Sequence, residues 1–183
     1  MKKYELTKEK KEFLGRTLYR IRALKDFELL DGTIIHAGDL GGWVEKEDNL
    51  SQEGSAWVYG DAWVYGDALV YGNALVYGNA RVYGDARVYG DAWVSGEAWV
   101  YGDAQVYRME HIMTFGPAGS RNGTTTFYRN KNNGISVTCG CFNGSIEDFL
   151  AQVNETHSDN KHGQVYRAAA ELAKLQIDLE GEQ

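Results

Sequence analysis

The sequence lacks an excess of basic residues. Its 183 residues include 19 Lys and Arg against 26 Asp and Glu, which gives a formal net charge of −7. A protein that binds nucleic acid through its phosphates normally carries a basic face. We therefore expect no direct nucleic-acid binding. The hydrophobic content of 43%, with 13% aromatic residues, is enough to fold one domain or two small ones.

Cysteines and long apolar runs are also scarce. Cys139 and Cys141 are the only cysteines, and so close a pair is more typical of reduced thiols than of the disulfide framework of a secreted protein. No run of 18 apolar residues occurs, so no transmembrane helix is predicted. The start, MKKYELTKEKKEF, has no apolar core for a signal peptide. We expect a soluble cytoplasmic protein with no membrane partner.

What the sequence has instead is a six-residue repeat from Ala56 to Tyr107. It reads AWVYGD AWVYGD ALVYGN ALVYGN ARVYGD ARVYGD AWVSGE AWVYGD AQVY. In each unit Ala and Val stand two apart and share one face of a short strand, while Gly with Asp or Asn supplies a turn. A strand and a corner every six residues predict a narrow triangular coil, in which three units make one turn. So short a period is typical of a solenoid.

The repeat resembles that of the hexapeptide-repeat, left-handed parallel β-helix family, in which an inward aliphatic residue is followed four positions later by a small one. The segment AGDLGGWV at 37–44, followed by QEG at 52–54, is similar to bacterial and phage β-helix proteins of the YdcK type. The resemblance implies a mainly β fold, with a left-handed parallel β-helix of about four turns.

We divide the chain into three parts. Residues 1–42 are predicted to form an N-terminal cap with a short helix at 7–14 and a strand, and residues 43–107 the left-handed β-helix. Val44 and Leu50 should start the coil, and the eight-residue step from Leu50 to Val58 implies two extra residues at one corner.

Residues 108–183 are predicted to form a small α+β module in the order β-β-β-α-α. Its strands are expected near 111–115, 124–129 and 135–139. One helix should follow a cap at Ser145, and the second should run from about Gln164 to Leu179. Less specifically, this part resembles the tail found beside such repeats in phage-encoded proteins.

Trp and Tyr fill many outward positions of the coil, where residues 18 apart stack. Such side chains are enriched at interfaces, so we expect an association surface, and the family resemblance implies a trimer with parallel axes. The alternative is an aromatic ladder that only stabilises the coil. The predicted interface residues are Trp57, Trp63, Trp93, Trp99, Tyr65, Tyr83 and Tyr101.

The Gly-rich segment 116–126, GPAGSRNGTTT, is the best candidate for a ligand site. Glycines let backbone N–H groups approach an anion, hydroxyls add donors, and Arg121 with Arg129 would hold a phosphate. It is not a P-loop, because the Lys-Ser/Thr ending is missing, and the alternative is an ordinary turn. The predicted ligand residues are Gly119, Ser120, Arg121, Asn122, Thr124, Thr125 and Arg129.

Histidine is absent from residues 44–107. Resemblance to hexapeptide-repeat proteins would otherwise imply an acyltransferase, in which a histidine on or near the β-helix acts as the base; only His36 and His111 flank the repeat. Cys139 and Cys141, taken with two histidines near the predicted helices, match no common zinc spacing. We predict no catalytic residue, no metal and no cofactor.

Three classes of function remain. The first is a non-enzymatic oligomeric protein that holds a small anionic, nucleotide-like ligand. Given the resemblance to phage proteins, that ligand would be a host defence signal sequestered in the host cytoplasm. The second is a protein-interaction, inhibitor or structural module acting through its aromatic and acidic faces. The third is a hexapeptide-repeat acyltransferase. The missing histidine argues against the third, and the sequence does not separate the first two.

Overall fold

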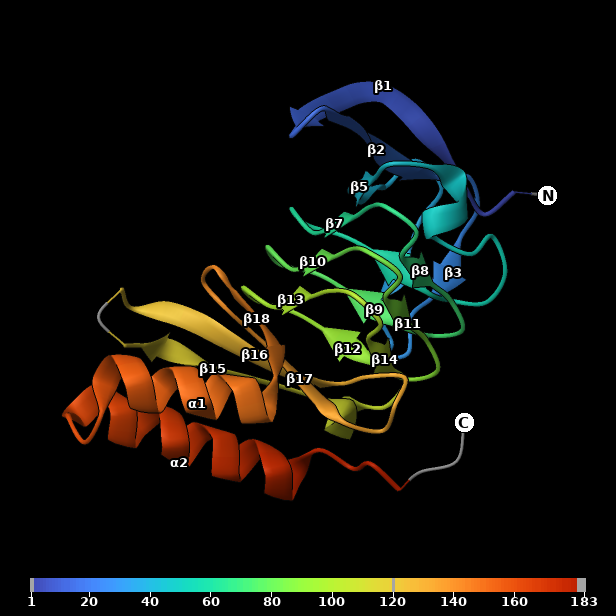
Figure 1. Cartoon of the computed structure of the whole chain (residues 1–183). Coiled ribbons are helices and arrows are strands. Elements are labelled where there is room, and N and C mark those ends of the chain that lie inside the picture. Colours follow the sequence, from blue (N-terminus) through green and yellow to red (C-terminus); the bar gives the residue numbers. More distant parts are fainter. Residues whose placement is uncertain (1, 120, 181–183) are drawn as a thin grey trace.

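A parallel β-solenoid lies at the centre of the molecule (Figure 1). The computed structural model describes residues 2–119 and 121–180. Each strand of the coil pairs with the strand 18 residues further on, as Trp63, Arg81 and Trp99 do. The predicted coil of three units per turn is therefore confirmed. Its strands are β6 (Trp57–Val58), β7 (Trp63–Val64), β8 (Leu69–Val70), β9 (Leu75–Val76), β10 (Arg81–Val82), β11 (Arg87–Val88), β12 (Trp93–Val94), β13 (Trp99–Val100) and β14 (Gln105–Val106).

The repeat contributes small side chains to the interior of the coil. Every Ala and Val of the repeat is at most 1% exposed. The corners require glycine for two reasons, as Gly84 illustrates. Its φ of +71° is unfavourable for other residues, and a Cβ there would lie 2.9 Å from the nitrogen of Gly102 in the next turn.

The first turn of the coil contains the two extra residues that the sequence predicts. Trp43 pairs with Trp63 and Leu50 bridges to Val70, so both pairings span 20 positions instead of 18. The pairings therefore confirm that Val44 and Leu50 start the coil and that the extra residues lie after Leu50.

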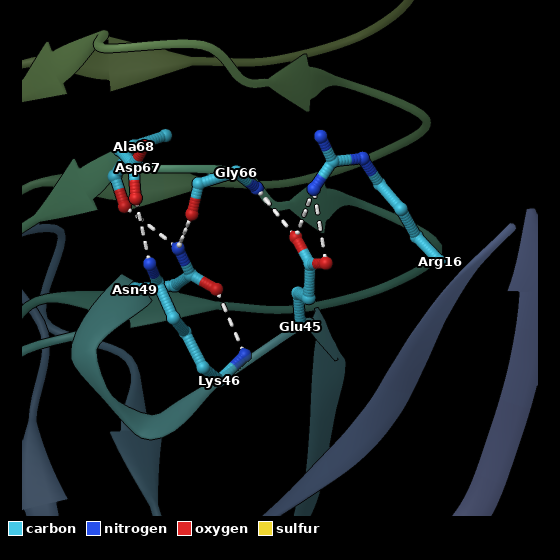
Figure 2. Close-up of polar contacts among 7 residues, drawn as sticks. All are labelled: Arg16, Glu45, Lys46, Asn49, Gly66, Asp67 and Ala68. Atoms are coloured by element: carbon cyan, nitrogen blue, oxygen red, sulfur yellow. Dashed lines mark hydrogen bonds and ion pairs between the residues drawn. The ribbon is translucent and has the colours of Figure 1, made fainter. Parts of the chain in front are cut away.

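The corner before Leu50 has no Gly-Asp turn and is built differently (Figure 2). It contains a 3-10 turn, η1 (Glu47–Asn49). The buried Asn49 amide donates to the carbonyl oxygens of Gly66, at 3.1 Å, and Ala68, at 2.9 Å. Glu45 accepts from the nitrogen of Gly66 at 2.7 Å and pairs with Arg16. Side chains here make the contacts between turns that backbone makes elsewhere.

A β-hairpin covers the N-terminal end of the coil, at the top of Figure 1. Strands β1 (Tyr4–Phe13) and β2 (Arg16–Ala23) are antiparallel, and β2 also pairs antiparallel with β5 (Leu40–Val44), which in turn pairs with β7. The predicted helix at 7–14 is therefore wrong. The two residues Leu14 and Gly15, both at positive φ, turn the chain, and pairing with β2 outweighs the weak local helix preference of the charged run.

The remaining N-terminal residues run along one side of the coil. They form β3 (Phe27–Glu28) and β4 (Ile34–Ile35), a small antiparallel pair. Leu29 and Ile35 belong to the same buried cluster as the coil interior. This arm therefore covers the outer face of the sheet formed by β6, β9 and β12.

A sheet and two helices close the other end of the coil. The sheet consists of β15 (Ile112–Ala118), β16 (Gly123–Arg129), β17 (Ile135–Cys139) and β18 (Phe142–Ser145), and a short turn, η2 (Met109–His111), leads into it. Helices α1 (Ile146–His157) and α2 (Lys161–Gln176) pack side by side on the face turned away from the coil (Figure 1). Phe127 and Val137 pack toward the helices, whereas Tyr128 belongs to the cluster inside the coil.

Two details of this module differ from the prediction. The sheet has a fourth strand where three were predicted, because Gly140 and Cys141 form a two-residue loop that leads from β17 into β18. The sequence of β18, FNGS, is rich in residues that favour turns, so it does not indicate a strand. The strand forms through its pairing with β17. Helix α2 begins at Lys161, before the expected Gln164, because the Asn160 side chain accepts from the nitrogen of Gly163 and caps it. Neither helix is long and apolar enough to cross a membrane, as far as the described residues show.

Candidate functional site

The chain itself covers part of the predicted aromatic interface. Trp57 is 1% exposed, with Tyr4 and Phe27 against its ring at centroid distances of 6.1 and 5.2 Å. Tyr65 is 8% exposed and contacts Phe13. The prediction that Trp57 and Tyr65 lie at a subunit interface is therefore wrong. An outward aromatic side chain on so narrow a coil is buried by the nearest apolar segment, and here that segment is the N-terminal arm.

The remaining predicted interface residues stay half-buried or exposed. Tyr83 stacks on Tyr65 at a centroid distance of 4.9 Å and on Tyr101 at 4.6 Å. These tyrosines therefore form the stabilising ladder that the sequence offers as an alternative. Trp93 packs against the buried cluster from the side. Trp63 and Trp99 line the cavities described below.

The predicted anion-binding segment is the β15–β16 hairpin and does not form one cluster of ligand groups. Gly119 fits under α2, because a Cβ there would lie 1.9 Å from the Tyr166 hydroxyl. Thr125 is fully buried and donates to the Cys139 sulfur at 3.1 Å. Thr125 is therefore not accessible to a ligand, and its prediction as a ligand residue is wrong. Gly119 as a ligand residue stays a prediction. Ser120 lies outside the described residues.

The two arginines that were predicted to grip one phosphate lie at opposite ends of β16. Arg121 is in the exposed turn before the strand, whereas Arg129 is its last residue and is fully buried beside Asn133. The six residue steps from Gly123 to Arg129 separate the two ends of the strand by about 20 Å. One phosphate cannot reach both, so the predicted clamp is wrong.

A cavity of about 370 Å³ lies where the coil meets the module. Trp99 lines it from the coil, and residues at or beside the β15–β16 and β17–β18 turns line it from the module. Asn122 and Thr124, two of the predicted ligand residues, lie in it. The lining residues are Glu97, Trp99, Asn122, Gly123, Thr124, Thr138 and Gly140.

The module holds the Trp99 backbone in place. Its N–H donates to the Thr126 hydroxyl at 3.1 Å, and the Thr138 hydroxyl donates to its carbonyl oxygen. These bonds replace the next turn of the coil, which is absent. The wall of the cavity is thereby fixed from both sides before any ligand enters.

A second, smaller cavity of about 200 Å³ continues along the same face of the coil. It shares Glu97 and Trp99 with the first, and we call the two together the Trp99 groove. The Arg81 guanidinium lies between two indoles, 4.4 Å from the Trp63 ring and 4.9 Å from the Trp99 ring. The lining residues are Asp61, Trp63, Asn79, Arg81, Glu97 and Trp99.

The charges in the groove are partly compensated. A hydrogen bond from Lys11, at 2.7 Å, holds the pKa of the Asp61 carboxyl below its usual range, and the Trp43 indole N–H also donates to it. Glu97 accepts from the Asn79 amide at 2.6 Å. Arg81 forms no ion pair with any described residue. Its cation–π contacts fix the guanidinium in position while its N–H groups remain available.

Neither histidine nor cysteine is among the residues that line the groove. Over residues 2–119 and 121–180, no group of three or more His, Cys, Asp or Glu could hold a metal ion. Burial, together with the neighbouring Arg129 charge, lowers the pKa of His111 to about 4. It does not line the groove.

Sequence reasoning missed Arg81, Glu97 and the role of Trp99 as a wall. One signal was available. Among the complete units of the repeat, 92–97 alone has Ser at the Tyr position and Glu at the turn Asp or Asn position. Glu97 lines both cavities.

Comparison with known proteins identifies the coil. The family model of the YdcK beta solenoid repeat matches residues 62–78, 68–82 and 80–96. A search of curated proteins finds no match. The resemblance that the repeat and the segment leading into it suggest is thereby confirmed for the coil.

Proposed function

We propose that this YdcK-like β-solenoid protein is a non-enzymatic binding protein whose Trp99 groove holds a small anionic, nucleotide-like ligand. The observation that carries the proposal is the pairing of a flat indole wall with an unpaired guanidinium in one groove. A volume of about 370 Å³ is within the range of small-molecule sites, roughly 300 to 1,000 Å³.

The Trp99 indole supplies the surface on which a planar base would stack. Stacking of one base on an aromatic side chain contributes about 1 to 3 kcal/mol and tolerates different bases. Gly123 and Gly140 line the opposite side without bulky side chains, so a flat ring has room to enter.

Arg81 supplies the anion contact that the sequence assigned to Arg121 and Arg129. A guanidinium presents a planar fork of donors that matches two phosphate oxygens. Stacking between two indoles orients that fork in advance, which lowers the entropic cost of binding. Lys11 neutralises Asp61 nearby, so Asp61 does not repel the ligand. Arg121 adds positive charge at the rim, since its Nη1 lies 3.8 Å from the place of a Cβ on Gly140.

The proposed cellular role is that of a protein that binds its nucleotide ligand without converting it chemically. A cytoplasmic protein that holds a nucleotide and has no catalytic group lowers the free concentration of that nucleotide. If the chain is phage-encoded, as the resemblance of its repeat and tail suggests, the ligand would be a host defence signal. This role is tested by measuring the free signal in infected cells with and without the protein.

The repeat provides a matched pair of variants for testing the site. Arg81 and Arg87 occupy the same position in two identical units, ARVYGD at 80–85 and 86–91. Arg81 lies in the groove, whereas Arg87 is exposed on another sheet. Isothermal titration with mono- and dinucleotides should show binding that Arg81→Ala weakens at least tenfold and that Arg87→Ala leaves unchanged.

Two outcomes would contradict the proposal. One is that isothermal titration shows no heat of binding with mononucleotides, cyclic nucleotides or ADP-ribose derivatives at millimolar concentration. The other is equal loss of affinity in both arginine variants, which would place the ligand outside the groove. Either result would favour the alternative of a protein-interaction module.

A further inference from the structure

The repeat departs from its own pattern beside the groove. Unit 92–97 carries Ser95 where the other complete units carry Tyr, and Glu97 where they carry Asp or Asn. Glu97 is one methylene longer than the aspartates at the other corners. The change therefore extends a carboxylate at the one corner that borders both cavities.

Two corners with the same internal contact show what is special about Glu97. The Asn79 amide donates to Glu97 Oε1 at 2.6 Å, and the Asn73 amide donates to Asp91 Oδ1 at 3.0 Å. Each carboxylate accepts a hydrogen bond from the amide 18 positions earlier, in the preceding turn of the coil. Asp91 borders neither cavity, whereas Glu97 lies beside the Trp99 ring in both.

The second oxygen of Glu97 remains available to a ligand. Across the part of the chain that the structure describes, only the contact through Oε1 is formed by this carboxylate. The Asn79 amide anchors the carboxylate through Oε1 at the corner that lines both cavities with Trp99. A carboxylate is an acceptor only and cannot donate a hydrogen bond.

We propose that Glu97 selects nucleotides whose base carries an exocyclic amino group, adenine or cytosine, over those with a keto group at that position, hypoxanthine or uracil. This inference rests on the proposed function of the groove. A base stacked on Trp99 presents its edge to Glu97, where an amino group donates to the free oxygen. A keto oxygen would instead place two acceptors together, and a polar group left unmatched in a binding site costs affinity.

The test compares two ligand pairs that differ at that group, AMP with IMP and CMP with UMP. Isothermal titration with the wild-type protein should give at least tenfold tighter binding of the amino member of each pair. In Glu97→Gln the preference should fall to less than threefold, because the amide can donate to a keto group as well as accept. Asp91→Asn, which changes the matching corner away from the groove, should keep the wild-type preference.

The outcomes separate this inference from the proposed function. If all four nucleotides bind the wild-type protein equally, the groove binds nucleotides but Glu97 does not select them, and the inference is wrong. The same conclusion follows if Glu97→Gln keeps the tenfold preference. If none of the four binds, the proposed function fails and the selectivity fails with it.

Discussion

At the scale of single residues, the coil tolerates little change inside and considerably more outside. Val82 is fully buried among other Val and Ala side chains, while its neighbour Tyr83 points outward and stacks on the tyrosines of adjacent turns. The interior holds no polar side chain from the repeat, so an inserted charge would have no partner. The two neighbours therefore offer a direct test of which face of the strand is buried.

Val82→Asp should prevent stable folding. A carboxylate in this interior has neither water nor a donor, and its burial costs several kcal/mol. Tyr83→Ser loses two aromatic contacts and should cost only about 1 to 3 kcal/mol. Urea denaturation followed by circular dichroism measures both. Comparable losses in the two variants would mean that the strand faces are inverted.

His111 should make stability depend on pH in mildly acidic solution. Burial and the Arg129 charge lower its pKa in the folded state to about 4, against 6.5 for the unfolded chain. The unfolded chain therefore binds the proton more tightly between these values. The contribution of His111 to the free energy of unfolding is complete above pH 6.5. It falls as the pH drops toward 4, by up to about 3 kcal/mol.

Thermal or urea denaturation between pH 7 and pH 4 measures this loss. Since other groups also titrate in the range, the informative quantity is the difference between wild type and His111→Gln. The variant should lose about 3 kcal/mol less over the interval. Parallel pH curves for the two proteins would show that the His111 pKa is not lowered by folding.

At the scale of elements, periodic local signals are predictable and long-range pairing is not. The spacing of Ala, Val and Gly fixes the coil and even its two extra residues, because each unit repeats the same short-range rule. Strand β1 gives no such signal, since TKEKKE is charged throughout and becomes a strand only through pairing with β2. The candidate site depends on long-range contact as well. Trp99 and Asn122 lie in different parts of the sequence, and only the seating of the module on the coil brings them together.

The N-terminal arm makes a prediction about Trp57. Its ring partners, Tyr4 and Phe27, belong to the same chain, so Trp57→Ala should cost about 3 to 5 kcal/mol of folding stability, as for other buried large aromatics. The loss should be the same at 2 and at 100 µM protein, since no second chain takes part. Urea denaturation at both concentrations measures it. A loss that grows on dilution would show that Trp57 does lie at a subunit interface.

The expected trimer itself stays a prediction, to be tested by sedimentation.

At the scale of the whole molecule, the coil is a short rod with both ends covered. The hairpin of β1 and β2 covers one end and the module covers the other, as Figure 1 shows. The Trp99 groove runs along the side between these two covers and takes residues from the coil and from the module. This location explains why a regular repeat can carry a specific site. The regular coil provides the framework of the groove, and Arg81 at a variable outward position and Glu97 at a corner that departs from the repeat give it its charged groups.

The most direct test of the account is fluorine NMR of protein labelled with 5-fluorotryptophan. The chain contains five tryptophans, at positions 43, 57, 63, 93 and 99, so each contributes one resonance, which single Trp→Phe variants assign. On titration with AMP, the Trp99 resonance should shift saturably, with a smaller shift for Trp63. Trp57 and Trp93, on another face of the coil, serve as internal controls and should stay unchanged. An unmoved Trp99 resonance at saturating AMP, or a shift confined to Trp57 and Trp93, would contradict a ligand in the Trp99 groove.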